Sequence, residues 1–307
     1  MRNPEKVLNS LTKHSNQTDY KFERLYRVLF NEKMYYRAYQ KLSKKQGNNT
    51  NGSDGKNIDG MNIVEIKQLI QKLRDESYQP APARRTYIPK KNGKMRPLGI
   101  PAFKDKLVQE VMRMVLEAVY EDSFSYMSHG FRPAKSCHTA LKYLQDNFIG
   151  AKWFIEGDIK GFFDNINHDV LIKILRERIK DECFIRLVRK FLNAGYIENW
   201  VFHRNYSGTP QGGIISPLLA NIYLDKLDKY MMEYIGKFDK GKKRRRNPEH
   251  RKLEGRKRTV IKKLARETDM GNILMLQKEI KEIEKKRVQI PAADGMDSNY
   301  KRLKYVR

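Results

Sequence analysis

Apolar residues recur at helical spacing along much of the chain, with polar residues between them. In residues 1–46 the apolar stripe is formed by Phe22, Leu25, Tyr26, Leu29 and Phe30, which predicts a helical and basic N-terminal region. The same spacing predicts helices in residues 63–73, 107–119, 167–179, 219–227 and 273–283. The last of these is expected to pack on the protein or to pair with a second copy.

Two stretches predict strands instead. Residues 84–101 contain short extended runs on both sides of Lys91-Asn92-Gly93-Lys94, which predicts a hairpin. In residues 151–159, Trp153, Phe154 and Ile155 lie between glycines, which predicts one more strand. Residues 47–60 are dense in Gly, Asn and Asp and predict a loop. Helices that alternate with a few separated strands indicate an α+β fold with a small antiparallel sheet.

The charge of the chain points to a polyanionic partner. Its 63 Lys and Arg against 36 Asp and Glu give a formal charge of +27, too basic for an ordinary metabolic enzyme and typical of a protein that binds nucleic acid. Residues 240–290 hold 19 basic and 7 acidic residues, a net charge of +12. Because few aromatic residues lie among them, we expect contacts to phosphates rather than base stacking. The alternative is that residues 240–290 form a charged surface segment that contacts only solvent. The predicted RNA-binding residues are Lys242, Lys243, Arg244, Arg245, Arg246, Arg256, Lys257, Arg258, Lys262 and Lys263.

Other classes are excluded. No apolar stretch approaches the ~20 residues that span a bilayer, and the N-terminus lacks a signal-peptide core. Two cysteines, Cys137 and Cys183, do not make a disulfide framework, and no CxxC pair suggests zinc. We therefore expect a soluble protein of a reducing compartment, the bacterial cytoplasm, with no membrane partner.

One candidate for chemistry is the stretch 154–164. An apolar strand that ends at Asp158 places a carboxylate at a sheet edge, where Mg²⁺ takes oxygen ligands, and the Ile159 carbonyl lies beside it. The backbone amides of Gly161 and Phe162 form a candidate nest for phosphate oxygens. The alternative for Asp158 is that it merely ends the strand. For Asp164 we favour a structural role at the start of the next helix.

Two more candidates lie in a turn and in the hairpin. The Gly-rich turn 207–213 lets the backbone approach a flat or charged ligand, and Gln211 offers hydrogen bonds to a base or sugar. Lys90 and Arg96 lie on opposite arms of the hairpin and could converge on one triphosphate. The alternative is a solvated basic hairpin. The run 128–133 (SHGFRP) is assigned no chemistry.

Four runs, KNGKMRPLGIP, HGFRP, FIEGDIKGFFDNI and GTPQGGIISPLLANI, occur in the order and spacing of known family blocks. Together they resemble the reverse transcriptase domain of group II intron-encoded proteins, also called intron maturases. The resemblance covers essentially the whole chain and is weakest in residues 1–50 and 236–296. It implies a right-hand polymerase fold, with helical fingers, small antiparallel sheets and part of a palm.

The resemblance also implies roles for single residues. Members extend a DNA primer on an RNA template with two Mg²⁺ ions, and they bind group II intron RNA for splicing and mobility. Asp158 and the Ile159 carbonyl would be metal ligands, and Phe163 would exclude ribonucleotides by its bulk beneath the sugar. Lys90 and Arg96 would hold the dNTP triphosphate. The remaining nucleotide-binding residues would be Gly161, Phe162, Gln211 and Gly212.

The chain departs from the family in one respect. The second metal-binding pair, Tyr-Ala-Asp-Asp, is absent, and Lys304-Tyr305-Val306-Arg307 resembles the strand just before it. We therefore expect a fragment that holds half of the metal ligands, is inactive alone, and exposes a palm edge that invites a homodimer. The expected parts are an N-terminal extension (1–50), fingers (51–150), palm (151–235), basic insertion (236–296) and a further palm strand (297–307).

Two other functions stay open. One is an RNA-binding splicing cofactor that has lost polymerase chemistry. The other is a different prokaryotic reverse transcriptase, of the retron or diversity-generating type. The basic N-terminal extension and the insertion favour the intron class over the second.

Overall fold

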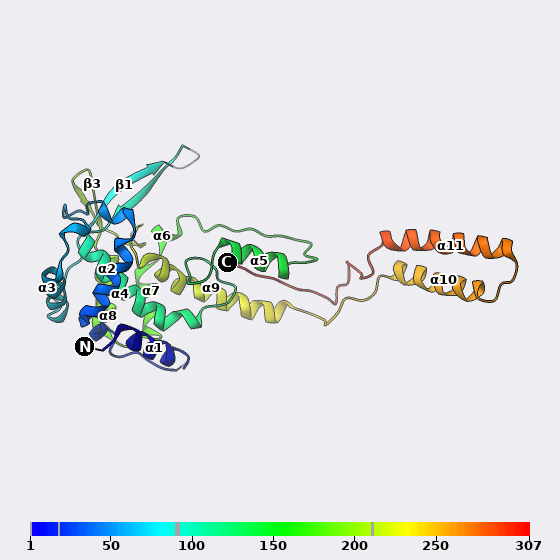
Figure 1. Ribbon diagram of the computed structural model, residues 1–307, viewed down its shortest axis with the longest axis horizontal. Coiled ribbons are helices and arrows are strands. Elements are labelled where there is room, and N and C mark those ends of the chain that lie inside the picture. The colour runs from blue at the N-terminus through cyan, green and yellow to red at the C-terminus, as the bar shows by residue number, and fades with distance from the viewer. Residues whose placement is uncertain (1, 18, 90–92, 210–211) are drawn as a thin grey trace. The chain divides into compact units, whose positions relative to one another are not determined.

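The computed structural model describes residues 2–17, 19–89, 93–209 and 212–307. The chain forms two compact units (Figure 1). Unit 1 contains Met1–Tyr230 together with Val306–Arg307, and unit 2 contains Met231–Tyr305. The chain therefore leaves unit 1 once and returns to it at the end. The five-part division expected from the sequence stays a prediction.

Helices make up most of unit 1, and polar residues fix where several of them begin. Asn62, Asn167 and Asp181 cap α3, α7 and α8 with their side-chain oxygens, and Ser136 forms a capping box with Thr139 at α5. The helices are α1 Pro4–Ser15, α2 Glu32–Ser43, α3 Ile63–Arg74, α4 Phe103–Tyr120, α5 Cys137–Asn147, α6 Phe162–Asn165, α7 His168–Arg176, α8 Glu182–Leu192 and α9 Ser216–Phe238, with 3₁₀ turns η1 Tyr26–Phe30, η2 Gln46–Asn49, η3 Ile58–Gly60 and η4 Glu121–Ser123.

The sheet of unit 1 has four strands in the order β2-β1-β3-β4. The predicted hairpin is confirmed, since β1 (Ala83–Pro89) pairs antiparallel with β2 (Met95–Ile100), and Ile88 lies opposite Arg96. The expectation of a purely antiparallel sheet is wrong, because β1 runs parallel to β3 (Tyr196–Glu198), which pairs antiparallel with β4 (Val201–His203). The β1–β2 hairpin projects from the helices (Figure 1).

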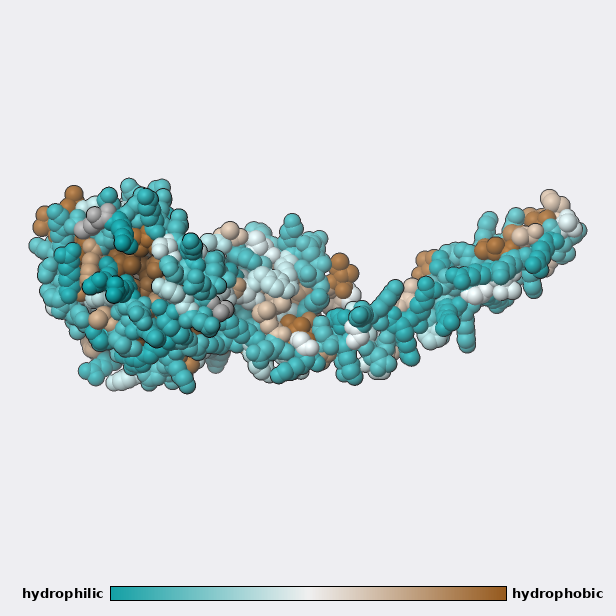
Figure 2. Space-filling view, turned by 90° about the horizontal axis from the view of Figure 1, so that it is seen from below, coloured by the Kyte–Doolittle hydropathy of each residue, from teal (hydrophilic) through white to brown (hydrophobic). Residues whose placement is uncertain are grey.

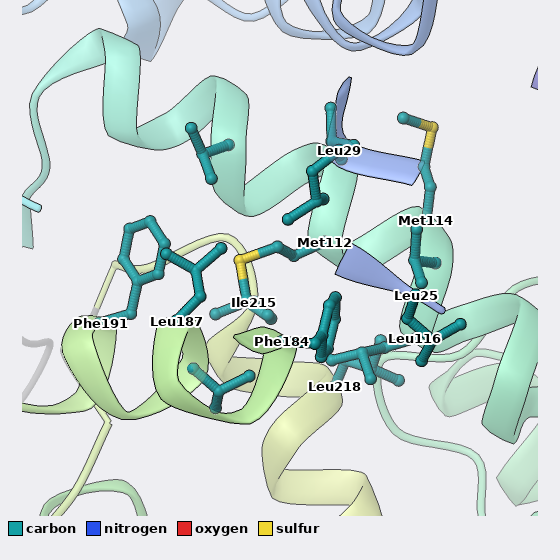
Figure 3. Close-up of a cluster of buried hydrophobic side chains, with 14 of the residues drawn as sticks. Leu25, Leu29, Met112, Met114, Leu116, Phe184, Leu187, Phe191, Ile215 and Leu218 are labelled. Carbon is teal, nitrogen blue, oxygen red and sulfur yellow. The ribbon is translucent and has the colours of Figure 1, made fainter. Parts of the chain in front are cut away.

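The core of unit 1 is built around α4, in which most residues are buried. Figure 3 shows Leu29 of η1, Met112 of α4, Phe184 of α8 and Leu218 of α9 pointing toward one another. Burial of such side chains contributes about 1.5–3 kcal/mol each. The helices predicted at 63–73, 107–119 and 167–179 are confirmed as α3, α4 and α7, although α7 ends at Arg176.

Some apolar positions behave differently from the prediction. The stripe from Phe22 to Phe30 does face the core, but it lies on η1 and extended backbone rather than on one helix. The backbone of Phe22 is held by Arg178 and Lys180 across the unit, which replaces helical hydrogen bonds there. Ile63 and Leu227 are exposed, although the predicted helices place both on the apolar face.

The strand predicted at 151–159 is wrong. These residues form no strand, and the Trp153 and Ile155 side chains are 88% and 91% exposed. A strand needs ladder partners for its backbone groups, and none of the described strands lies beside this segment. The apolar composition of residues 151–159 indicates strand propensity, but it does not show whether another strand lies beside them.

Unit 2 is a helical pair with a base at which the two ends of the segment meet in isolated β-bridges. The helices α10 (Pro248–Leu264) and α11 (Met270–Gln289) begin at the capping side chains of Asn247 and Asp269, and they lie side by side (Figure 1). The predicted helix 273–283 is part of α11, and Ile283 and Val260 are buried between the helices. At the base, Lys240 pairs antiparallel with Lys301, and Arg246 with Ala293. None of the helices in the described ranges combines the length and apolar composition needed to cross a bilayer.

Candidate functional site

Gly208 and Thr209, in the first part of the Gly-rich run 207–213, are fixed against α6 by hydrogen bonds. The Thr209 N–H donates to the Phe163 carbonyl at 2.7 Å, and the Gly208 N–H donates to the Ile166 carbonyl at 2.8 Å. Gly208 has a φ of 82°, and a Cβ there would lie 2.6 Å from the Phe163 carbonyl oxygen, so only glycine allows this approach. The turn thus sets the backbone position of Phe163.

The other side of the turn lies against the hairpin and α4. Gly212 has a φ of 101°, and a Cβ there would lie 2.1 Å from the Gly99 carbonyl oxygen of β2. The Ile214 N–H donates to Gln109 Oε1 of α4 at 2.8 Å. One turn therefore joins α6, the hairpin strand that carries Arg96, and the central helix.

Two aromatic rings contact Phe163, the residue predicted to select the sugar. Phe163 is half-buried, with its ring centroid 5.9 Å from that of Phe162 and 6.3 Å from that of Phe131, both in edge contact. Phe162 contacts Tyr223 of α9 at 6.0 Å. Gly161 adopts a φ of 60° at the N-terminus of α6, as its predicted place in a tight turn requires.

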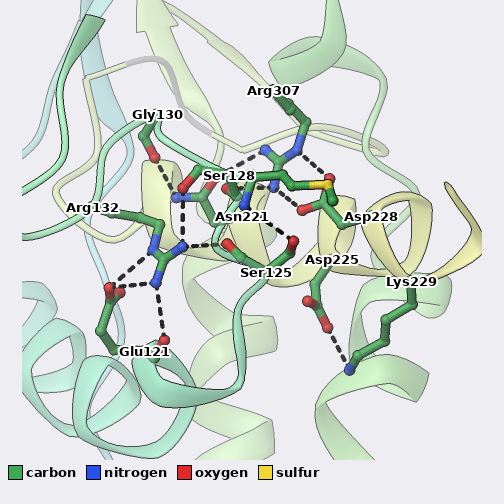
Figure 4. Close-up of polar contacts among 11 residues, drawn as sticks. Glu121, Ser125, Ser128, Gly130, Arg132, Asn221, Asp225, Asp228, Lys229 and Arg307 are labelled. Atoms are coloured by element: carbon green, nitrogen blue, oxygen red, sulfur yellow. Dashed lines mark hydrogen bonds and ion pairs between the residues drawn. The ribbon is translucent and has the colours of Figure 1, made fainter. Parts of the chain in front are cut away.

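The loop 125–132 is held by a polar network (Figure 4). Arg132 donates to the Glu121 carboxylate at 2.9 Å and to the Ser125 and Ser128 carbonyls, and Asn221 Nδ2 donates to the Gly130 carbonyl at 2.8 Å. Burial raises the pKa of the Glu121 carboxyl, although the Arg132 guanidinium acts in the opposite direction. Sequence patterns assign no chemistry to the run 128–133, and Phe131 joins the site only through the tertiary fold.

Asp158 lies in the irregular, exposed segment before α6, and Ile159 is 51% exposed. In the part of the chain that the structure describes, no three acidic, His or Cys side chains gather in a group that could hold a metal ion. One carboxylate does not fit a two-metal site, so no reaction step is assigned to Mg²⁺ here. The metal roles of Asp158 and Ile159 stay predictions.

The predicted triphosphate-binding pair is described only in part. Arg96 is exposed on β2, while Lys90 and Gln211 lie outside the described residues. On the neighbouring strands, the Arg85 guanidinium lies 3.4 Å from the Tyr196 ring centroid, and Tyr87 donates a hydrogen bond to Glu198, which raises the pKa of Tyr87. These contacts hold β1 against β3.

The ten predicted RNA-binding residues of unit 2 fall into two sets. Five are bound by carboxylates of unit 2: Arg245 by Asp294, Arg246 and Arg258 by Glu254, Arg256 by Glu279, and Lys257 by Glu284. The other five have no ion pair among the described residues: Lys242, Lys243, Arg244, Lys262 and Lys263. The face of unit 2 seen in Figure 2 is mostly hydrophilic.

Comparison with known proteins gives consistent matches. A profile of the reverse transcriptase (RNA-dependent DNA polymerase) family matches residues 88–243. The chain is 48% identical to the group II intron-encoded protein LtrA of Lactococcus lactis subsp. cremoris, over 98% of this chain and 50% of that protein. It is 49% identical to an uncharacterized 91 kDa protein in the cob intron of Schizosaccharomyces pombe, over 69% of this chain and 26% of that protein.

Among solved structures, a partial Cas6-RT-Cas1–Cas2 complex matches with a TM-score of 0.44 and 25% identity, over 68% of this chain and 35% of that one. The chain spans about half the length of the Lactococcus relative.

Proposed function

The chain belongs to the reverse transcriptase (RNA-dependent DNA polymerase) family, in its group II intron-encoded branch, and we propose that unit 1 binds an incoming dNTP beside a primer on an RNA template. Its α+β fold is that of reverse transcriptase fingers with part of the palm. The proposal gives the triphosphate to Arg96 with Lys90, the sugar to Phe163, and the base pair to Gln211 and Gly212.

One observation carries the proposal. The turn 207–213 contacts the carbonyl of Phe163 on one side and the carbonyl of Gly99 on the other. Gly208 and Gly212 allow this close packing, which places a bulky aromatic ring and the arginine-bearing strand on two sides of one backbone segment. A nucleotide site needs a cation for the phosphates, backbone that can lie against the base pair, and a bulky side chain that excludes the wrong sugar.

For unit 2 we propose binding to group II intron RNA through phosphates. Lys242, Lys243, Lys262 and Lys263 are exposed and have no carboxylate partner within the described ranges, so RNA binding breaks no internal ion pair. Other predicted RNA-binding residues, such as Arg256 and Lys257, form ion pairs with Glu279 and Glu284. These ion pairs must break before the two residues can bind phosphates. Polymerisation by these 307 residues alone is not expected, because two metal ions need more carboxylates than Asp158 supplies.

The test of the nucleotide site is equilibrium binding of a dNTP to the chain in the presence of an RNA template and DNA primer. Arg96→Ala should weaken binding by roughly 10- to 150-fold, because one charge-assisted hydrogen bond contributes about 1.5–3 kcal/mol. Arg27→Ala, which removes an exposed arginine of η1, should leave the affinity unchanged. Equal affinities for both variants would contradict the assignment of Arg96.

A separate assay addresses the second function, RNA binding without polymerase chemistry. Primer extension by the chain should be undetectable while RNA binding remains. In a polymerase-active protein that contains these residues, Asp158→Asn should abolish extension and leave RNA affinity intact. Undiminished extension by Asp158→Asn would remove Asp158 from the metal site and favour a different carboxylate.

A further inference from the structure

Phe131 combines three properties that seldom occur together. Its backbone has a φ of 55°, a conformation that is costly for a bulky residue. Its side chain is 72% exposed, so burial in the core does not offset that cost. Its ring nevertheless makes an edge contact with Phe163, the proposed sugar-selecting residue. Strained conformations held by their surroundings occur preferentially at functional sites.

The surroundings of Phe131 hold the strained conformation from both sides. On one side, Asn221 of α9 binds the Gly130 carbonyl at 2.8 Å. On the other, the Arg132 guanidinium donates to the Ser125 and Ser128 carbonyls at 2.6 and 3.0 Å and to Glu121 at 2.9 Å. Four hydrogen bonds thus fix the loop that carries the exposed Phe131 ring.

The Phe163 ring makes edge contacts with two other rings. Phe162 is anchored by Tyr223 of α9, while Phe131 belongs to the loop 125–132. The backbone of Phe163 is fixed by the Thr209 N–H, so side-chain rotation is the freedom that remains to it. A ring that excludes a 2′-hydroxyl by its bulk works only if it cannot rotate away, and an edge contact with Phe131 opposes such a rotation.

We propose that Phe131 is a specificity-determining residue, which holds Phe163 in place and so makes the site reject ribonucleoside triphosphates. This inference rests on the proposed nucleotide site and adds a second residue to its sugar selection. Phe131 is a positioning residue, since it acts through Phe163.

The experiment measures the affinity of the chain for dCTP and for CTP, in the presence of an RNA template and DNA primer. In the wild type, dCTP should bind more tightly, and Phe163→Ala should remove this preference. Phe131→Ala should reduce the preference roughly tenfold, the size expected from a small change in the fit of a pocket, by strengthening CTP binding rather than weakening dCTP binding.

Two further variants separate this role from a structural one. Phe131→Gly adopts the φ of 55° freely, so it should melt no lower than the wild type and still lose the preference. Phe131→Tyr keeps the ring and should keep the preference. Trp200→Ala is the matched control, because Trp200 is also an exposed aromatic residue with a positive φ, of 66°.

The outcomes distinguish the two proposals. An unchanged preference in Phe131→Gly, with the preference lost in Phe163→Ala, overturns the role of Phe131 and leaves the nucleotide site standing. A wild type with no preference overturns the nucleotide site and this inference together. A loss of equal size in Trp200→Ala also overturns the inference, since any exposed aromatic would then have the same effect.

Discussion

Arg307 Nε and Nη2 donate to the two carboxylate oxygens of Asp228, at 2.9 and 2.6 Å, and the Asp228 side chain has no exposed surface. The same guanidinium donates to Ser128 Oγ at 2.9 Å and to Asn221 Oδ1 at 3.2 Å. The backbone of Arg307 also bonds to Met127 and His129. One side chain thereby connects α9 to the loop that carries Phe131.

Arg307→Ala should destabilise unit 1 by about 3–5 kcal/mol, because it removes the bidentate partner of a buried carboxylate. The measurement is urea unfolding followed by circular dichroism. Arg176→Ala is the control, since the pair Arg176–Glu182 is 49% exposed on each side and should contribute at most about 1 kcal/mol. Similar midpoints for the two variants would show that the Arg307–Asp228 pair is not a stabilising contact.

A buried carboxylate should make stability depend on pH. Asp105 is 1% exposed, accepts hydrogen bonds from Tyr78 Oη and the Ala81 N–H, and has a pKa that burial raises from 3.8 to about 6. The folded protein holds this proton more tightly than the unfolded chain does. The contribution to stability is therefore fully present below pH 3.8 and is lost as the pH rises through 6.

As the pH rises, the free energy of unfolding of the wild type should fall by on the order of 3 kcal/mol through the ionisation of Asp105. Asp105→Asn keeps an amide oxygen that can accept a hydrogen bond from the Ala81 N–H, and it does not titrate. The difference in unfolding free energy between wild type and Asp105→Asn should therefore shift in favour of the variant between pH 4 and pH 7. A difference that does not change with pH would show that Asp105 stays ionised.

Phe163→Ala should alter selection more than stability. Its side chain is half-buried, so truncation should cost less than the ~3–5 kcal/mol expected for a fully buried aromatic residue. In a polymerase-active protein that contains these residues, the variant should incorporate ribonucleotides. Phe184→Ala removes a ring with 0% exposure and should show the opposite pattern, a large drop in melting temperature with selection retained. Collapse of Phe163→Ala without altered sugar preference would make Phe163 a core residue only.

The two sets of cations in unit 2 should differ in their effect on RNA binding. Each phosphate contact contributes about 0.9 to the slope of log K against log salt on a duplex. Changing Lys242, Lys243, Lys262 and Lys263 to Gln should therefore flatten the slope by roughly 3 to 4. Changing Arg245, Arg256, Lys257 and Arg258 to Gln removes the same charge but should flatten it less, because these residues are bound to carboxylates. Equal slopes for the two variants would mean that net charge alone governs binding.

The parts of the fold that depend on neighbouring residues could be predicted. The hairpin of β1 and β2 follows from its turn residues, and α7 begins at Asn167 because the side chain of Asn167 caps it. The parallel pairing of β1 with β3 could not be predicted, since it joins Ala83 to Tyr196 across more than a hundred residues. The segment 151–159 has the composition of a strand, but composition does not show whether a partner lies beside it.

The candidate site divides in the same way. The glycines of the turn 207–213 are visible in the sequence, and two of them have the positive φ that makes glycine necessary. The contact of Phe131 with Phe163 was missed, because only the tertiary fold brings the loop and α6 together. The carboxylate partners of Arg256 and Lys257 were missed for a related reason, as they come from α11, the neighbouring helix.

The paired base of unit 2 has a consequence for the entropy of folding. Lys240 N–H donates to the Lys301 carbonyl at 3.0 Å, and Lys301 N–H donates back at 3.2 Å, so the two ends of the segment are held together where it leaves and re-enters. The conformational entropy lost when a flexible loop is closed grows with its length. Without the base, unit 1 would have to close a loop as long as the whole segment, which would cost roughly 1 kcal/mol more than closing the short connections that lead into the base. Residues added between α10 and α11 would then lengthen only the part of the chain beyond the Lys240–Lys301 pair. They would not change the entropy that unit 1 loses on folding. Unit 2 can therefore differ in length among related chains while Arg307 still reaches Asp228.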